Sequence, residues 1–187
     1  VLLLVGLELI AGVAWLAAVW PPAGVRASRG SAFFMLAVGA ILRGLMLPST
    51  PILEDDFYRY LWDGAVVAHG YNPYTQAPQE FLDPGGTVSG EADDLSALGR
   101  DGQAVLARIN HPSLRTIYPP VAQGAFALAH GLAPWSLIAW RVVLLLFDAA
   151  TVALLLLLLR RLALSPLWAA IYWWSPLLVL HGVNGAH

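Results

Sequence analysis

The hydrophobic positions of this chain form long runs with no polar face. Four such runs lie at residues 1–20, about 31–47, 135–159 and about 167–180. A helix that crosses a bilayer needs about 20 predominantly apolar residues. A helix that is apolar all round has no side to present to water. The pattern therefore predicts four transmembrane helices and an all-α polytopic membrane protein.

A long polar region, residues 49–134, separates the two pairs of predicted spans, which occupy 1–48 and 135–187. The polar region holds most of the acidic residues and most of the turn-forming sequences, including "NPY" and "DPGG". Its last part, 118–134, is apolar but barely long enough to cross a bilayer, and Gly, His and Pro interrupt it. We therefore expect interfacial or re-entrant helices in this region.

The arginines orient the predicted spans. Arg26 and Arg29 lie in the first loop, and Arg160 and Arg161 follow the third run. Loops that carry an excess of Arg face the cytoplasm. Both loops satisfy this rule only when residues 118–134 do not fully cross. The long polar region is then extracytoplasmic, which gathers the clusters of acids and histidines on one face.

Composition supports the membrane assignment and excludes several other classes. Of the 187 residues, 58% are hydrophobic and 12% are charged, against roughly 25% charged in soluble domains. A net charge of −2 without a basic stripe argues against a nucleic-acid binder. The absence of cysteine excludes disulfides, thiolate nucleophiles and cysteine-bound metals. Both ends fall at apolar runs, so we expect the chain to be part of a longer polytopic protein.

Two adjacent acids open the polar region in the stretch "ILEDDFYRYLWDG". If 55–69 is a helix, Asp55, Arg59 and Asp63 follow one another at intervals of four residues and share one stripe. Arg59 can then hold Asp63 and orient Asp55. Asp56 is left with less compensating charge, which makes it the better candidate for a general base.

The other faces of this helix are apolar or aromatic. Phe57, Leu61 and Ala65 form a stripe that we expect to lie on the membrane surface, with Tyr58 and Trp62 at the interface. Acids in the first turn of a helix also favour its dipole without any chemistry. Periodicity alone therefore does not decide between a helix terminus and a catalytic site.

A family resemblance favours the catalytic interpretation. The sequences "EDDFYRYLWDG", "GYNPY" and "YPP" resemble those of membrane glycosyltransferases of the GT-C fold, most closely the bacterial polyprenyl-phosphate-mannose-dependent mannosyltransferases. The resemblance covers about residues 53–120, with a weaker echo in "WWSPLLVLHGVNGAH", where Ser175 stands in place of a frequent Asn. It implies a GT-C-like transmembrane helix bundle in the bacterial inner membrane, with the active site on its extracytoplasmic face.

The implied reaction moves a hexose, mannose in the first instance, from a polyprenyl-phosphate donor to an extracytoplasmic glycan or glycolipid acceptor. Asp56 is the candidate general base, with Asp55 beside it. The candidate substrate-binding residues, several of them suited to a leaving phosphate, are Arg59, Tyr60, Asp63, His111, Arg115, Tyr118 and His187. We assign no metal ligands and no definite cofactor, and whether a divalent cation assists stays open.

Two other functions compete with this one. A transporter or flippase of lipid-linked sugars would use Glu8, Arg141 and Asp148 as its pathway, and a non-catalytic assembly subunit would use the acidic loop to dock a partner. Transporters tend to show inverted repeats, and none is detectable in this sequence. Glu8 and Asp148 are also interpreted as polar groups that pair with neighbouring helices.

Overall fold

The computed structural model describes residues 2–19, 27–51, 55–81 and 97–186. Within these ranges the regular structure is entirely helical and contains no strand. The chain divides into two compact units, one formed by residues 1–50 and 144–185 and the other by residues 51–143. Each unit is described by itself.

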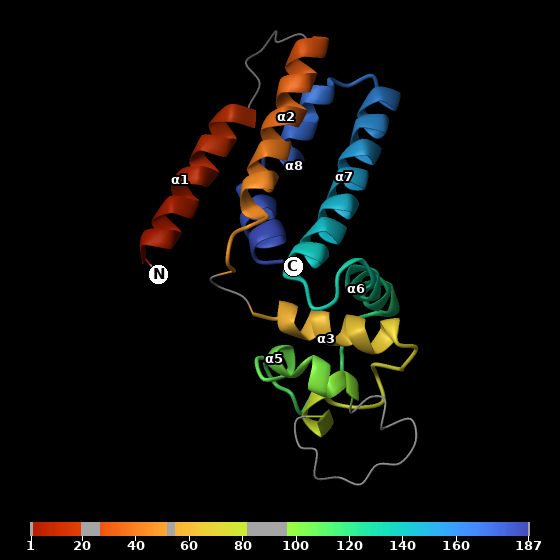
Figure 1. Ribbon diagram of the computed structural model, residues 1–187. Coiled ribbons are helices and arrows are strands. Elements are labelled where there is room, and N and C mark those ends of the chain that lie inside the picture. The colour runs from red at the N-terminus through yellow and green to blue at the C-terminus, as the bar shows by residue number, and fades with distance from the viewer. Residues whose placement is uncertain (1, 20–26, 52–54, 82–96, 187) are drawn as a thin grey trace. The chain divides into compact units, whose positions relative to one another are not determined.

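The first unit consists of helices from the N-terminal part and from the C-terminal part of the chain (Figure 1). They are α1 (Leu2–Val19), α2 (Arg29–Met46), the part of α7 (Leu137–Arg161) from residue 144 onward, η2 (Pro166–Ala169), α8 (Ala170–Trp173) and the π-helix η3 (Leu178–Asn184).

Two helices, α2 and α7, are long and apolar enough to cross a membrane by length and composition. Only 17% of the apolar window of each is buried within the protein. The core helix of a soluble protein would be mostly buried, so the exposed apolar faces of α2 and α7 favour a lipid or protein neighbour. The apolar stretch of α1, Val5–Val19, is shorter.

The last predicted span is wrong as one continuous helix. Residues 167–180 fall into η2, α8 and the start of η3, with an interruption before Pro176. Proline lacks an N–H group and disfavours the helical conformation in the residue before it. Pro176 therefore accounts for the break after Trp174.

Helix α2 begins at a capping box. The Ser28 side chain accepts a hydrogen bond from the Ser31 backbone N–H at 3.0 Å, and the Ser31 hydroxyl accepts one from the Ser28 N–H at 2.8 Å. These bonds satisfy two N–H groups that a helix terminus would otherwise leave open.

Helix α2 packs closely on α8 because Gly39 has no side chain. A Cβ atom at Gly39 would lie 2.1 Å from the indole of Trp173. That indole donates a hydrogen bond to the Leu36 carbonyl at 2.9 Å, and the Trp174 indole donates one to the Met35 carbonyl at 2.8 Å.

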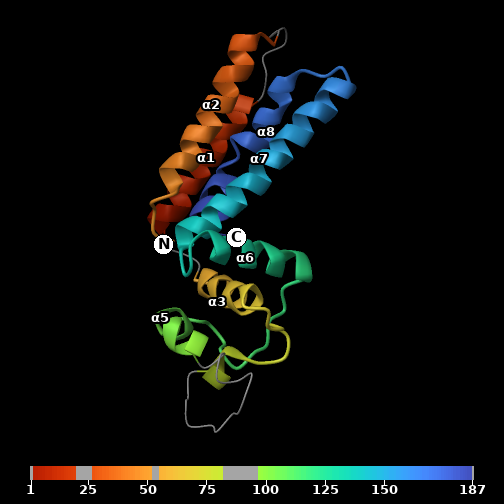
Figure 2. The ribbon, with the colours of Figure 1, turned by 45° about the vertical axis from the view of Figure 1, so that its right-hand side comes forward.

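The second unit is built on α3 (Phe57–Ala68). On one side α3 packs against α6 (Pro120–Leu132), and α5 (Gln103–Leu106) packs against it as well, with η1 (Pro78–Phe81) beside α5 (Figure 2). Helix α6 has 13 residues, about 20 Å at 1.5 Å per residue, against a hydrocarbon layer of about 30 Å. The helix is thus shorter than that layer, and the interfacial or re-entrant position of this segment stays a prediction.

The expected membrane-facing stripe of α3 is wrong. Phe57, Leu61 and Ala65 are buried inside the protein, and Trp62 is only 2% exposed. The Trp62 ring lies 5.3 Å from that of Phe81. Helices on more than one side of α3 cover faces that the sequence pattern had assigned to the membrane surface.

Candidate functional site

The Asp56 carboxylate lies at the N-terminus of α3, where no described residue bonds to it. Asp56 is the N-cap residue of the helix and is half-buried, yet its side chain makes no capping hydrogen bond. Within the part of the chain that the structure describes, it also forms no other hydrogen bond and no ion pair. A capping role therefore does not explain this acid.

Asp55, its neighbour, is exposed and accepts a hydrogen bond from the side-chain amide of Asn110. The expectation that Arg59 orients Asp55 is wrong, because the Arg59 guanidinium bonds elsewhere. Asn110 was not among the predicted site residues. It lies 55 residues further along the chain, where helical spacing gives no signal.

Arg59 and Asp63 form the ion pair that their spacing predicted, but they lie inside the protein. Arg59 Nε is 2.8 Å from Asp63 Oδ1, and Arg59 Nη1 donates to the Leu114 carbonyl at 2.8 Å. Gln123 Nε2 donates to Asp63 Oδ2 at 3.1 Å. Asp63 is only 1% exposed and both of its oxygens are bonded. Both side chains are therefore engaged inside the protein, where they hold α3 to the segment around Leu114 and to α6.

Tyr60 and Tyr118 bring the acidic helix and the "YPP" sequence into contact. Their rings are nearly perpendicular, with centroids 5.0 Å apart, and Tyr60 stacks on Phe126 of α6 at 4.8 Å. Burial raises the pKa of the Tyr118 phenol, a hydrogen bond with Tyr60 opposes that rise, and the negative charge of Asp56 adds to it. Tyr118, itself half-buried, is thus within electrostatic range of Asp56.

The "NPY" sequence also contacts Tyr118. The Tyr74 hydroxyl donates a hydrogen bond to the Tyr118 carbonyl at 2.7 Å. The three sequences that carry the family resemblance therefore converge in one unit, although 44 residues separate Tyr74 from Tyr118.

The remaining predicted binding residues are less constrained. His111 and Arg115 are exposed, and neither side chain bonds to another residue in the described ranges. His111 has a φ of 51°, a conformation that non-glycine residues adopt uncommonly. His187 lies outside the described residues. Among those that are described, no group of three or more His, Asp or Glu is placed to hold a metal ion.

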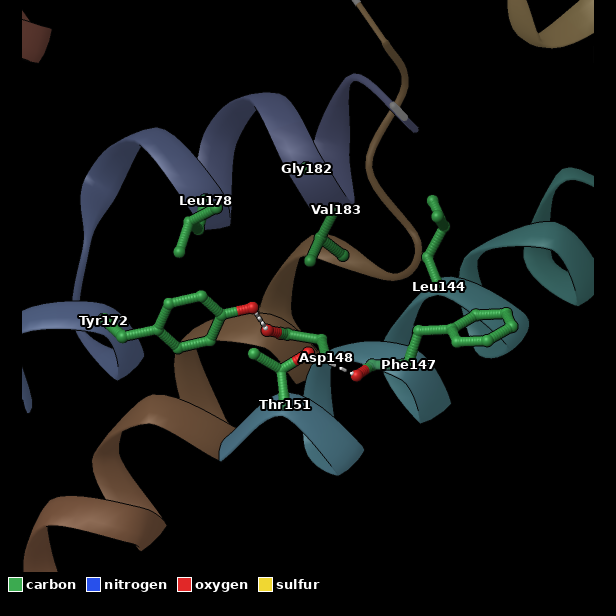
Figure 3. Close-up of a pocket in the computed structure, with 8 residues that line it drawn as sticks. All are labelled: Leu144, Phe147, Asp148, Thr151, Tyr172, Leu178, Gly182 and Val183. Carbon is green, nitrogen blue, oxygen red and sulfur yellow. Dashed lines mark hydrogen bonds between the residues drawn. The ribbon is translucent and has the colours of Figure 1, made fainter. Parts of the chain in front are cut away.

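A second polar cluster lies in the first unit, around Asp148. Its carboxylate forms an ion pair with Arg43. It also accepts a hydrogen bond from the Tyr172 hydroxyl at 2.7 Å (Figure 3). Arg43 also donates to the Trp173 carbonyl at 2.6 Å, with its guanidinium 3.7 Å from the Trp173 ring centroid. Asp148, Tyr172 and Thr151 line a cavity of about 200 Å³ whose other walls are largely apolar.

The sequence interpretation had placed Asp148 beside Arg141 in one pathway and had missed Arg43. The available signal was Arg43 itself, a charge within an apolar run. Such charges usually require a partner on another helix. Glu8 behaves as expected, because its carboxylate lies 3.6 Å from His181 of η3.

Comparisons of the chain with protein-family models, with curated proteins and with solved structures found no match. The class that the described residues define is an all-helical protein with two helices long and apolar enough to cross a membrane. Any more specific function rests on the residues themselves.

Proposed function

We propose that this protein is an integral membrane glycosyltransferase of the GT-C type. It would transfer a hexose, mannose in the first instance, from a polyprenyl-phosphate donor to a glycan or glycolipid acceptor on the extracytoplasmic face. The observation that carries the proposal is the half-buried carboxylate of Asp56, to which none of the described residues bonds. It belongs to the unit in which the acidic, "NPY" and "YPP" sequences meet.

Asp56 has the properties that a general base requires. In the proposed reaction the acceptor oxygen attacks the anomeric carbon, its proton passes to the Asp56 carboxylate, and the bond from sugar to phosphate breaks. A base must come within about 2.6–3.2 Å of the acceptor hydroxyl or reach it through one water. A carboxylate already bonded to a protein donor would have to exchange that bond first. Asp55 and Asp63 both have such donors, so Asp56 is the best placed of the three.

The other groups divide between binding and support. His111 and Arg115 are exposed donors without partners among the described residues, which suits them to a leaving phosphate. Asp55 would orient the acceptor. By contrast, Arg59, Asp63 and Trp62 are buried, which favours a supporting role for most of the "RYLWDG" sequence.

The exposed apolar helices support the membrane part of the proposal. α2 and α7 are long enough to cross and leave most of their apolar surface outside the protein core. The arginine pairs at the ends of these segments favour a cytoplasmic position for the loops that carry them. The acidic region then faces the opposite side, where a lipid-linked sugar would be used.

The transporter alternative has less support. Its proposed pathway acid, Asp148, is neutralised by Arg43, which is itself held by the Trp173 carbonyl. These bonds are typical of a group that fastens helices together. An assembly subunit would not need Asp56 to accept a proton. A substitution that removes only this ability therefore distinguishes the assembly hypothesis from the enzyme hypothesis.

The test is Asp56→Asn in the complete product of the gene. The amide keeps the size of the carboxylate but cannot accept the proton, so transfer should fall about 10²–10⁴-fold while expression and donor binding persist. Radiolabelled sugar transfer from a polyprenyl-phosphate donor is measured in membranes at matched protein level.

Asp101→Asn is the matched control. It removes an acid of the same unit but keeps an oxygen that can accept the Trp135 indole hydrogen bond. The control should transfer sugar normally. Normal transfer by Asp56→Asn and by Asp55→Asn would eliminate the catalytic role of the acidic pair, whereas loss in Asp55→Asn alone would exchange the roles of the two acids. Absence of transfer by the unmodified protein would eliminate the enzyme proposal.

A further inference from the structure

A chain of buried hydrogen bonds runs from α3 to the backbone of Tyr118. Gln123 Nε2 donates to Asp63 Oδ2 at 3.1 Å and to Thr116 Oγ1 at 2.8 Å. Thr116 Oγ1 also lies 3.4 Å from the Tyr118 backbone N–H, which donates to it. One hydroxyl thus connects the acidic helix with the peptide of a candidate binding residue.

Burial shields these hydrogen bonds from water, and the Asp63 carboxylate determines which group donates. Gln123 is 3% exposed and Thr116 is 8% exposed, so water does not compete for their polar groups. The Asp63 carboxylate accepts hydrogen bonds only, so the amide nitrogen of Gln123 must face it. The same nitrogen then has its second hydrogen available for Thr116.

The segment that leads to Tyr118 is also held at other points. Arg59 binds the Leu114 carbonyl, and Tyr74 binds the Tyr118 carbonyl. The Tyr118 N–H therefore donates to the Thr116 hydroxyl, and the Tyr118 carbonyl accepts from the Tyr74 hydroxyl. These bonds fix the backbone from which its ring projects toward Tyr60.

We propose that Thr116 is a positioning residue for the glycosyl transfer. Its hydroxyl oxygen accepts hydrogen bonds from Gln123 Nε2 and from the Tyr118 N–H, and it thereby fixes Tyr118 at the site of Asp56. This inference rests on the proposed function. Thr116 is itself buried and does not reach substrate, so it acts entirely through Tyr118.

Two substitutions separate the hydroxyl from the shape of the side chain. Thr116→Val keeps the branched shape but leaves Gln123 Nε2 and the Tyr118 N–H without their acceptor, whereas Thr116→Ser keeps the acceptor. Hydrogen exchange of the peptide that spans 114–118 should quicken several-fold in Thr116→Val and remain near wild type in Thr116→Ser.

Transfer should follow the same pattern. A displaced site group costs up to about 10²-fold, so kcat/KM should fall about 10- to 100-fold in Thr116→Val and little in Thr116→Ser. Since Thr116 acts through Tyr118, Thr116→Val should add no further loss in a Tyr118→Ala background.

The outcomes separate this inference from the proposed function. Unchanged exchange in Thr116→Val would overturn the anchoring role whatever the protein catalyses. Faster exchange with normal transfer, while Asp56→Asn is inactive, would overturn only the positioning role. Equal losses in both Thr116 variants, or losses that add to those of Tyr118→Ala, would overturn it as well, because they indicate general destabilisation. Absence of transfer by the unmodified protein would remove the reaction and this role with it.

Discussion

At the scale of single residues, three aspartates on or beside α3 differ in burial and in hydrogen bonding. Asp63 is enclosed and bonded to Arg59 and Gln123, while Asp55 is exposed and bonded to an amide. Asp56 is half-buried and has no donor among the described residues. Identical side chains therefore have different chemical capacities within nine positions.

Arg59→Ala should destabilise the second unit strongly. Removing one partner of a buried ion pair leaves an uncompensated buried charge, here on Asp63, at a cost of about 3–5 kcal/mol. The Leu114 carbonyl also loses its donor. Thermal and chemical unfolding of the detergent-solubilised protein measures the effect. Arg115→Ala, at an exposed site, should change the free energy of unfolding by only about 0.5 kcal/mol. Equal stability of the two variants would contradict an interior position for Arg59.

Sequence reasoning reached the Arg59–Asp63 pair because helical geometry brings residues four apart together. It could not reach Asn110 or Gln123, whose partners lie 55 and 60 residues away. Such contacts depend on how the 109–119 segment and α6 return to α3. No local periodicity encodes that return.

At the scale of elements, the crossing of α3 and α6 depends on a glycine. A Cβ atom at Gly64 would lie 2.4 Å from the Phe126 carbonyl oxygen, a backbone atom that no rotamer change can move away. The missing side chain allows the helices to approach until Tyr60 stacks on Phe126. The close packing of α3 against α6 thus explains why the "WDG" sequence ends in glycine, at Gly64.

Gly64→Ala should therefore separate the two helices and lower stability by about 1–3 kcal/mol. Gly124→Ala is the matched control, since a Cβ there meets nothing within 4 Å. Alanine is the better helix former by up to about 1 kcal/mol, so this control should be neutral or stabilising. Melting temperatures of the two variants measure the difference. A stable Gly64→Ala protein would refute the close approach.

The elements show where hydrophobic patterning succeeds and where it fails. It located α2 and α7, which are long and apolar throughout. It misassigned the faces of α3, because a helix covered on several sides gives the same pattern as one lying at a lipid surface. It also joined η2, α8 and η3 into one span, because the apolar run continues across Pro176 while the helix does not.

At the scale of the whole molecule, the membrane orientation is the property open to direct measurement. These 187 residues contain no cysteine, so in a protein without other thiols a single introduced thiol reports its own side. Ser113→Cys and Leu162→Cys place thiols at exposed positions, one in the acidic region and one after α7. An impermeant maleimide added to intact cells should label the first and not the second. Strong labelling at 162, or none at 113, would contradict the predicted orientation.

The Arg43–Asp148 ion pair has a consequence for how the chain is made. Its partners are 105 residues apart, and synthesis proceeds at about 5–20 residues per second. A nascent chain therefore presents the Arg43 guanidinium about 5–20 s before its carboxylate exists. Arg43 lies in the last turn of α2, where its long side chain can reach the polar edge of the membrane while α7 is still being made. In the proposed membrane setting, α2 would therefore insert first, and the Arg43–Asp148 pair would close only when α7 enters the lipid beside it.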